Sequence, residues 1–286
     1  MNTASAQWAA VTASVRGAAH ERTGLPNQDA VTCADVEGST SGLVAAVADG
    51  HGGSRYVRSD LGAGLAVKLG CEVAARAVLE LGPCPNESRI HSELTCPLIE
   101  EVIERWRAQV STHLSAHPFS SEERGRAGTA LDADPHLAYG CTLILGLFGP
   151  NWVGLLQIGD GDVSVVRGGV VSCPVPGDLR LVGGETTSLC LPTAASDARV
   201  AALTGALPEL VILSTDGYGN SFASPSWQQD VGRDLSEYVH RNGLEALAAE
   251  LPGWLAESGA ASGDDVSMAL VQRARAAGRS VPSHRP

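Results

Sequence analysis

The chain has 286 residues, of which 44% are apolar, with a formal net charge of -12 and a pI near 5.0. This length and composition suffice for one large hydrophobic core, so we expect a single domain over residues 1–272, followed by a disordered tail at 273–286. With 20 basic residues against 32 acidic ones, the chain has no surplus positive charge to neutralise phosphates, which argues against a nucleic-acid-binding protein.

Short apolar runs with turn residues at their borders predict buried strands. In chain order these runs are 42–48, 142–148, 152–158, 163–167, 210–213 and 266–271, with a further strand expected at 30–33. Longer stretches at 55–81 and 94–116 carry apolar residues at helical spacing and predict an antiparallel helix pair joined by a loop at 82–92. Residues 227–255 predict two more helices, broken near Asn242-Gly243 and near Pro252-Gly253.

Two segments read as irregular. Residues 120–135 are rich in Gly, Ser and charge and predict a mobile loop, and residues 172–207 predict a surface insert. The predicted strands fall on either side of the helices expected at 55–81 and 94–116. The helices expected at 227–255 form a second helical block near the C-terminus. This order favours an α+β fold in which helices cover the outer faces of two antiparallel sheets packed as a sandwich.

The cysteines and the N-terminal residues carry no targeting or cross-linking signal. The seven cysteines are scattered without a CxxC pair, so neither a disulfide framework nor a zinc site is indicated. Residues 1–13 lack the features of a signal peptide, and no run of 18 uncharged apolar residues occurs. We therefore expect a soluble cytoplasmic protein with reduced thiols and no membrane partner.

Four short acidic motifs each begin or end an apolar run. They are Asn27-Gln28-Asp29, Asp49-Gly50-His51-Gly52-Gly53, Thr215-Asp216-Gly217 and Gly263-Asp264-Asp265. Carboxylates gathered at strand ends repel one another unless a positive ion lies between them, and a hard divalent cation with oxygen ligands suits that role. Two such ions can bridge a water, lower its pKa and fix it for in-line attack on phosphorus. The motifs favour a metal-dependent hydrolase that needs no protein nucleophile.

Each motif also has a simpler interpretation. Asp-Gly pairs are common turn residues, and Asp264-Asp265 taken alone would be a solvated pair in a turn. A histidine between glycines, such as His51, could merely be exposed. The occurrence of all four motifs at strand ends favours the metal interpretation.

A set of motifs together resembles the metal-dependent protein phosphatases, the PPM family of type 2C serine/threonine phosphatases. The motifs are Asn27-Gln-Asp-Ala30, Val47-Ala-Asp-Gly-His-Gly-Gly53, Gly140-Cys-Thr-Leu143, Ile158-Gly-Asp-Gly-Asp162, Ser214-Thr-Asp-Gly217 and Asp264-Asp-Val-Ser267. They occur in the order typical of that family, and the resemblance covers roughly residues 11–271. The Asp-Gly-His-Gly-Gly element is highly specific, whereas the Gly-Asp and Thr-Asp-Gly elements are weak by themselves.

The resemblance implies a four-layer αββα sandwich with a binuclear Mg2+ or Mn2+ centre in a cleft at one end of the sheets. In this arrangement Asp49 bridges both ions and the carbonyl of Gly50 binds one of them. Asp216 and Asp264 complete the shell of the other ion. Whether Asp264 or Asp265 is the ligand stays open at this point.

Further roles follow from the same resemblance. Asp29 is expected to hold a water of the metal shell, and Asp160 to bind a third, weaker ion. His51 matches the histidine proposed as the general acid for the leaving alkoxide, a role that suits an imidazole. Residues 172–207 correspond to the variable flap of the family.

The sequence departs from the family where the substrate phosphate is usually gripped by an arginine. Here Gly17 is followed by His20 at the arginine position, and extra residues precede Asn27. We expect His20 or Arg22 to take over this role. A histidine binds phosphate strongly only when protonated, and it lacks the bidentate fork of a guanidinium.

Two more positions differ from the family pattern. Gln28 replaces the usual acid and removes one negative charge from the site, and Asp162 stands where the motif has Arg. The sequence does not explain the change at Asp162. The pattern Gly17-x-x-His20 with Pro26-Asn-Gln-Asp29 nevertheless resembles a bacterial branch of the family.

These observations predict a metal-dependent phosphatase acting on phosphoserine or phosphothreonine, whose phosphoprotein partner is a Ser/Thr kinase or the target of that kinase. Two alternatives stay open. A catalytically silent member would bind a phosphoprotein or a regulator, although Asp49, Asp216 and Asp264 are all present. A two-metal phosphoesterase for small molecules would prefer free phosphate monoesters to phosphopeptides.

Overall fold

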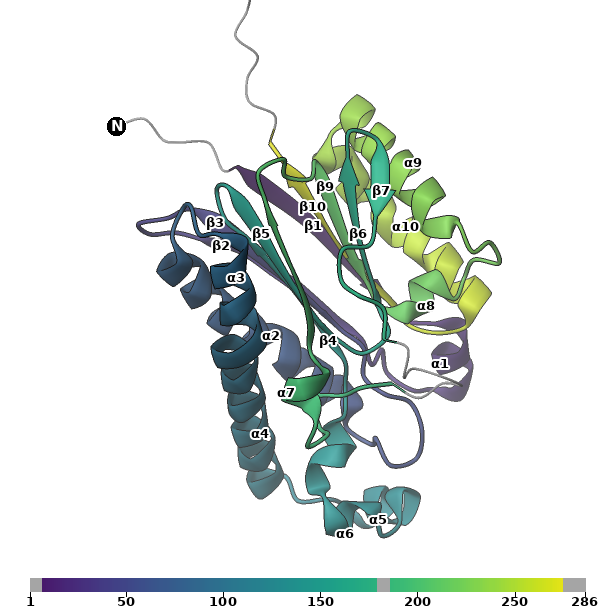
Figure 1. The fold of residues 1–286 in the computed structure, drawn as a ribbon. Helices are drawn as coiled ribbons and strands as arrows, with labels where there is room; N and C mark the ends of the chain where they lie inside the picture. Colours follow the sequence, from purple (N-terminus) through teal and green to yellow (C-terminus); the bar gives the residue numbers. More distant parts are fainter. Residues whose placement is uncertain (1–6, 179–185, 275–286) are drawn as a thin grey trace, which may run out of the picture.

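The computed structural model describes residues 7–178 and 186–274, which form two antiparallel five-stranded sheets with helices on both outer faces (Figure 1). The strand order is β1-β10-β9-β6-β7 in the first sheet and β2-β3-β4-β5-β8 in the second. The expected α+β class and the four-layer αββα sandwich are therefore confirmed.

The first sheet joins segments from both ends of the described chain. Its strands are β1 (Trp8–Val15), β10 (Val266–Arg273), β9 (Leu210–Ser214), β6 (Asp162–Arg167) and β7 (Val170–Ser172). β1 pairs with β10 along its whole length, from Trp8 opposite Arg273 to Val15 opposite Val266. β10 therefore lies between β1 and β9.

The second sheet contains the buried strands predicted at 42–48, 142–148 and 152–158, together with two edge strands. They are β2 (Ala30–Val36), β3 (Gly42–Ala48), β4 (Leu143–Phe148), β5 (Trp152–Ile158) and β8 (Arg199–Thr204). In β3, Leu43 and Val47 belong to the core between the sheets, whereas Val44 and Ala46 belong to the core beneath the helices. Because side chains alternate between the two faces and both faces are buried, the strand reads as a continuous apolar run.

Long helices form the outer layers (Figure 1). The second sheet is covered by α2 (Ser59–Leu81) and α4 (Ile99–Ala116), and the first sheet by α9 (Trp227–Asn242) and α10 (Leu244–Ser262). The predicted pairing of the first two helices is confirmed by the indole of Trp106 on α4, which donates a hydrogen bond to the carbonyl of Gly62 on α2 at 3.0 Å.

Shorter elements connect these layers. They are α1 (Ala18–Thr23), α3 (Glu87–Glu93), the π-helical turn η1 (Leu94–Leu98), α5 (Ser121–Ala127), α6 (Ala130–Ala133), the 3-10 helix η2 (Pro135–Tyr139), α7 (Ala194–Asp197) and α8 (Asp216–Gly219). α1 and α8 lie at the same end of the sandwich (Figure 1).

Several expected loops contain regular structure. The loop predicted at 82–92 holds α3, which begins because the side chain of Asn86 accepts a hydrogen bond from the N–H of Arg89. The loop predicted at 120–135 holds α5, where Ser120 and Glu123 form a capping box, and also α6. The insert predicted at 172–207 contains α7 and strand β8.

The C-terminal helices confirm one predicted break and contradict the other. Gly243, with a φ of +85°, separates α9 from α10 as expected. Pro252, however, lies inside α10, which continues past it because Leu247, Leu251 and Leu255 are buried on one side. Packing of that face outweighs the backbone hydrogen bond that proline cannot make.

The end of the chain differs slightly from expectation. Arg273, expected to begin the tail, is the last residue of β10. The rest of the expected tail at 275–286, and residues 179–185 of the expected insert, lie outside the described residues.

None of the described helices combines the length and apolar character needed to cross a bilayer. The seven cysteines are all free thiols.

Candidate active-site cleft

Strand pairing in the second sheet places two acidic motifs side by side. Ala30 pairs with Ala48, so Asp29, just before β2, and Asp49, just after β3, lie at neighbouring strand ends. The backbone of Asp49 is held by Thr142 at the start of β4, through hydrogen bonds to the hydroxyl (2.9 Å) and from the N–H (2.8 Å). Asp49 is therefore fixed where three strands of the sheet end.

The first sheet brings its acids to the same end of the sandwich. Ser214, the last residue of β9, pairs with the first residue of β6 and with the third residue of β10. This register places Asp216 beside the segments that lead into β6 and β10. The two sheets are joined here because the hydroxyl of Thr215 donates a hydrogen bond to Oδ2 of Asp29 at 2.8 Å.

A cleft of about 780 Å³ opens at this end. Its polar and charged lining residues are His20, Gln28, Asp49, His51, Arg55, Asp160, Thr186, Ser188, Asp216, Ser262 and Asp264, with the backbone of Gly50 among them. Most site residues predicted from the sequence are thus brought together. The exceptions are Asp29, Arg22 and Asp265, which are not among the described lining residues.

The contact between Asp49 and Asp216 is the electrostatic centre of the cleft. Burial raises the pKa of Asp49 well above its usual range, and the charges of Asp29 and Asp216 and a side-chain hydrogen bond with Asp216 raise it further. Oδ2 of Asp216 accepts a hydrogen bond from Asn220 at 3.0 Å, but its buried Oδ1 has no partner among the described residues. A buried carboxylate oxygen without a donor is unfavourable, and a cation beside it removes that penalty.

Three further carboxylates share this environment. Burial raises the pKa of Asp29, Asp160 and Asp264, and the charge of Asp216 adds to the rise for Asp160 and Asp264. We call Asp29, Asp49, Asp160, Asp216 and Asp264 the acidic cluster. Each member carries a carboxyl group whose ionised form a nearby cation would stabilise.

The acidic cluster has the donor chemistry of a hard-cation site. Carboxylate and carbonyl oxygens are the ligands that Mg2+, Mn2+ and Ca2+ prefer. No group of three or more His, Cys, Asp or Glu side chains within residues 7–178 and 186–274 is arranged to hold an ion as it stands. The oxygen donors of the acidic cluster nevertheless fit the chemistry of such an ion.

Asp264 and Asp265 differ completely in their surroundings. Asp264 lines the cleft, whereas Asp265 is 2% exposed. Oδ1 of Asp265 accepts a hydrogen bond from the N–H of Gly17 (2.7 Å), and Oδ2 contacts the N–H of Gln28 (2.6 Å) and Nδ1 of His20 (2.8 Å). Both oxygens of Asp265 are already engaged, so it does not fit the predicted role of metal ligand, and Asp264 is the ligand candidate.

His51 lies in the cleft and is held from two sides. Its backbone N–H donates a hydrogen bond to the carbonyl of Gly140 at 3.1 Å. Its ring packs edge-on against Tyr56, with 4.9 Å between the ring centres. Burial, with a smaller contribution from the charge of Arg55, lowers the pKa of His51 to about 4, although the charge of Asp216 acts in the opposite direction. The imidazole is therefore neutral at pH 7 in this environment.

The residues expected to replace the family arginine are placed differently from each other. His20 lines the cleft, with Nδ1 in contact with Asp265. Arg22 is exposed on α1, outside the described lining, so the structure does not bring it to the site. Gln28 lines the cleft, and its amide nitrogen donates to the hydroxyl of Ser59 at 2.8 Å.

Asp162 now has a structural explanation. Its Oδ1 accepts a hydrogen bond from the amide of Gln228 at 2.7 Å, which ties β6 to α9. Burial raises the pKa of Asp162 to about 6, and the Gln228 hydrogen bond opposes this rise. Asp162 thus anchors a helix beside the cleft and is not part of the described lining.

The sequence did not single out Arg55 or Tyr56, although both line the cleft. They directly follow the Asp-Gly-His-Gly-Gly motif, so their closeness in the chain to His51 was the only available signal.

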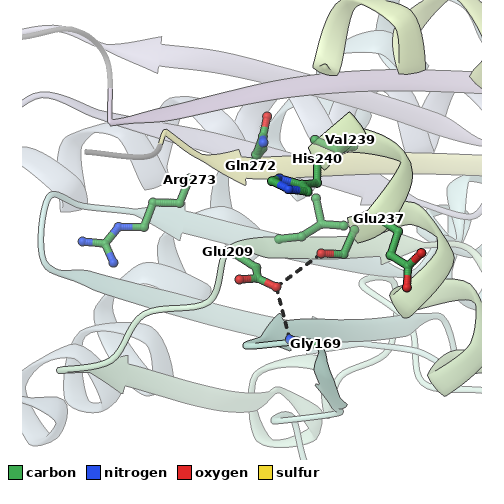
Figure 2. Close-up of a pocket in the computed structure, with 9 residues that line it drawn as sticks. Gly169, Glu209, Glu237, Val239, His240, Gln272 and Arg273 are labelled. Carbon is green, nitrogen blue, oxygen red and sulfur yellow. Dashed lines mark hydrogen bonds between the residues drawn. The ribbon is translucent and has the colours of Figure 1, made fainter. Parts of the chain in front are cut away.

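A second pocket of about 200 Å³ lies at the opposite end of the first sheet (Figure 2). It includes Leu210, the first residue of β9, and Arg273, the last residue of β10. There Glu209 accepts hydrogen bonds from the N–H of Gly169 and the hydroxyl of Ser236, both at 3.3 Å. This pocket contains no residue of the acidic cluster.

Comparison with known proteins agrees with this architecture. Residues 16–256 match the family model described as protein phosphatase 2C. No curated protein matches the sequence.

Similar solved structures include Stp1 of Staphylococcus aureus, a serine/threonine phosphatase, at 12% identity and a TM-score of 0.58, covering 93% of this chain and 95% of that one. The serine/threonine phosphatase of S. agalactiae shows 14% identity and a TM-score of 0.57, covering 93% and 100% of the two chains. PppA of Pseudomonas aeruginosa shows 19% identity and a TM-score of 0.52, covering 93% and 98%. At these identities the likeness is one of fold.

Proposed function

The chain belongs to the protein phosphatase 2C family, and from that premise we propose that it is a metal-dependent phosphatase acting on phosphoserine and phosphothreonine in proteins. The observation that carries the proposal is the buried contact between the carboxyl groups of Asp49 and Asp216, with Oδ1 of Asp216 left without a donor among the described residues. Divalent cations would offset the repulsion between the two carboxylates and would give Oδ1 of Asp216 a partner.

The residues that would hold the ions are Asp49, the carbonyl of Gly50, Asp216 and Asp264, with Asp160 available for a third ion. When bound, Mg2+ or Mn2+ would supply the Lewis acidity that lowers the pKa of a water and prepares it to attack phosphorus. Gly50 is suited to its position because a Cβ there would lie 2.5 Å from the carbonyl oxygen of Gln28. The close packing of that backbone requires a residue without a side chain.

Two other residues would position a water and supply a proton to the leaving group. Asp29 receives a hydrogen bond from Thr215 on one oxygen and can accept one from a water on the other. His51, which lines the cleft, would donate a proton to the leaving alkoxide. Its lowered pKa favours the neutral imidazole, but the negative charge of a phosphate would favour the protonated imidazole and raise that pKa.

We propose a Ser/Thr kinase or its target as the phosphoprotein partner. The setting would be the cytoplasm, and the seven free thiols support this, because reduced cysteines are typical of that compartment. The acidic balance of the chain supports a protein partner over a nucleic acid.

The test measures hydrolysis of an aryl phosphate and of phosphoserine and phosphothreonine peptides, with Mn2+, with Mg2+ and with excess EDTA, by the native protein and Asp216→Asn. Metal-dependent activity that prefers the peptides and is lost in the variant is the expected result. A preference for free monoesters would instead identify a small-molecule phosphoesterase. A folded protein inactive with every metal would be a silent binding module, which contradicts the proposal.

A further inference from the structure

The charges that line the cleft are strongly unbalanced. Four carboxylates, those of Asp49, Asp160, Asp216 and Asp264, face one guanidinium among the described lining residues, that of Arg55. A phosphate monoester brings more negative charge into this space. Oxygens that are not bound to metal need hydrogen-bond donors, and a guanidinium supplies these in a planar fork that matches phosphate.

The other basic side chains near the cleft are unsuited to this role. Arg58 is 7% exposed and both arms of its guanidinium are committed, with hydrogen bonds of 2.6 and 3.0 Å to the two carboxylate oxygens of Glu123. His20 offers a single remaining ring nitrogen, since Nδ1 contacts Asp265. Arg22 is exposed outside the described lining.

Arg55 is both positioned and available. Its guanidinium carbon lies 4.8 Å from the centre of the Tyr56 ring, a cation–π contact, and the same ring packs edge-on against His51. The stack rests on Gly140, where a Cβ would come within 3.0 Å of both rings. None of the N–H groups of Arg55 donates a hydrogen bond within the described parts of the chain, so its donors are free to meet a ligand.

We propose that Arg55 is the phosphate-binding arginine of this cleft, and that its guanidinium donates two hydrogen bonds to oxygens of the substrate phosphate. The inference rests on the proposed function and names the residue that replaces the family arginine. The layered contact of Arg55, Tyr56 and His51 places the phosphate-binding group next to the residue proposed to protonate the leaving group. Tyr56 then acts as a positioning residue for both neighbours.

The experiment compares the native protein with Arg55→Ala, Arg55→Lys and Arg22→Ala, the last being a matched control on an exposed arginine outside the described lining. In Mn2+, kcat and KM are measured with p-nitrophenyl phosphate, together with inhibition by inorganic phosphate. Calorimetry gives the affinity for Mn2+ alone and then for inorganic phosphate in the presence of Mn2+. The phosphate titration does not depend on turnover.

In Arg55→Ala we expect KM and the dissociation constant of inorganic phosphate to rise about 10- to 100-fold, the range for losing charge-assisted hydrogen bonds. Arg55→Lys should recover part of this loss, while Arg22→Ala and the Mn2+ affinity should stay within about twofold.

Unchanged phosphate affinity and an unchanged KM for p-nitrophenyl phosphate in Arg55→Ala would overturn the inference. If the native protein lacks activity but Arg55→Ala still weakens phosphate binding, the proposed function fails and the assignment of Arg55 stands.

Discussion

Nδ1 of His20 and Oδ2 of Asp265 are in hydrogen-bond contact at 2.8 Å. This contact ties α1 to the start of β10 and fixes the orientation of the imidazole that lines the cleft. The same carboxylate accepts the N–H groups of Gly17 and Gln28. One buried acid thus holds the N-terminal side of the cleft together, directly beside the metal-ligand candidate Asp264.

Substitution of Asp265 should mainly lower the stability of the fold, whereas substitution of Asp264 should mainly weaken metal binding. Asp265→Ala should lower the free energy of unfolding by about 2–5 kcal/mol, because it leaves the buried N–H groups of Gly17 and Gln28 without an acceptor. Asp264→Ala should change stability little in EDTA but weaken Mn2+ binding at least tenfold. Urea denaturation in EDTA and Mn2+ calorimetry measure these effects, and equal destabilisation by both variants would refute the division of roles.

The acidic cluster should destabilise the metal-free protein. Asp216→Asn removes a charge that raises the pKa of Asp49, Asp160 and Asp264. We expect its Tm in EDTA to rise by about 2–4 °C, which corresponds to about 1 kcal/mol, while the increase in Tm on adding Mn2+ disappears. Thermal unfolding with and without Mn2+ measures both. Asp35→Asn, at an exposed position of β2, is the control and should keep the response to Mn2+.

The ion pair between Glu123 and Arg58 should give a defined pH dependence of stability. Its hydrogen bonds lower the pKa of Glu123 from 4.5 to about 2. Because the folded-state pKa lies below the unfolded one, the contribution is complete above about pH 4.5 and is lost as the pH falls towards 2. The difference in Tm between the native protein and Glu123→Gln should be constant from pH 6 to 8 and shrink below pH 4.5. If the difference in Tm between the two proteins does not vary with pH, the stabilisation does not come from the ionised carboxylate of Glu123.

Replacing Gly50 or Gly52 by alanine should have very different effects on the stability of the protein. A Cβ at Gly50 would lie 2.5 Å from the carbonyl oxygen of Gln28 and 2.7 Å from that of Ser59, whereas nothing lies within 4 Å of a Cβ at Gly52. Gly50→Ala should therefore cost about 1–3 kcal/mol of folding free energy, and Gly52→Ala should stay within about 0.5 kcal/mol. Chemical denaturation of both variants provides the comparison, and similar values would argue against the tight packing at Gly50.

Most of the strands that the sequence predicted have two buried faces, with the edge strand β2 as the exception. β3, β4 and β5 read as continuous apolar runs because they lie inside both the sheet and the sandwich. β1 and β8 were missed because they are edge strands, where each residue is only partly buried or alternates with exposed ones. Their residues carry little of the apolar signal that strand prediction needs.

For the site, the sequence located the acids but could not assign every contact. Strand ends and glycine turns placed Asp49, Asp216 and Asp264 at one end of the fold. The role of Asp265 depends on which oxygens meet the backbone of Gly17, far away in the chain. The availability of Arg55 likewise depends on ring packing that no local pattern encodes.

The central place of β10 in the first sheet also sets the order in which the cleft can form. β10 follows both β1 and β9 in the sequence, so during synthesis it emerges after them and must insert between them. β10 follows directly on Asp264 and Asp265, so a nascent chain interrupted before these residues lacks both the strand that joins β1 to β9 and two of the carboxylates at the cleft. A ribosome-bound chain would therefore lack a complete cleft until β10 has been synthesised.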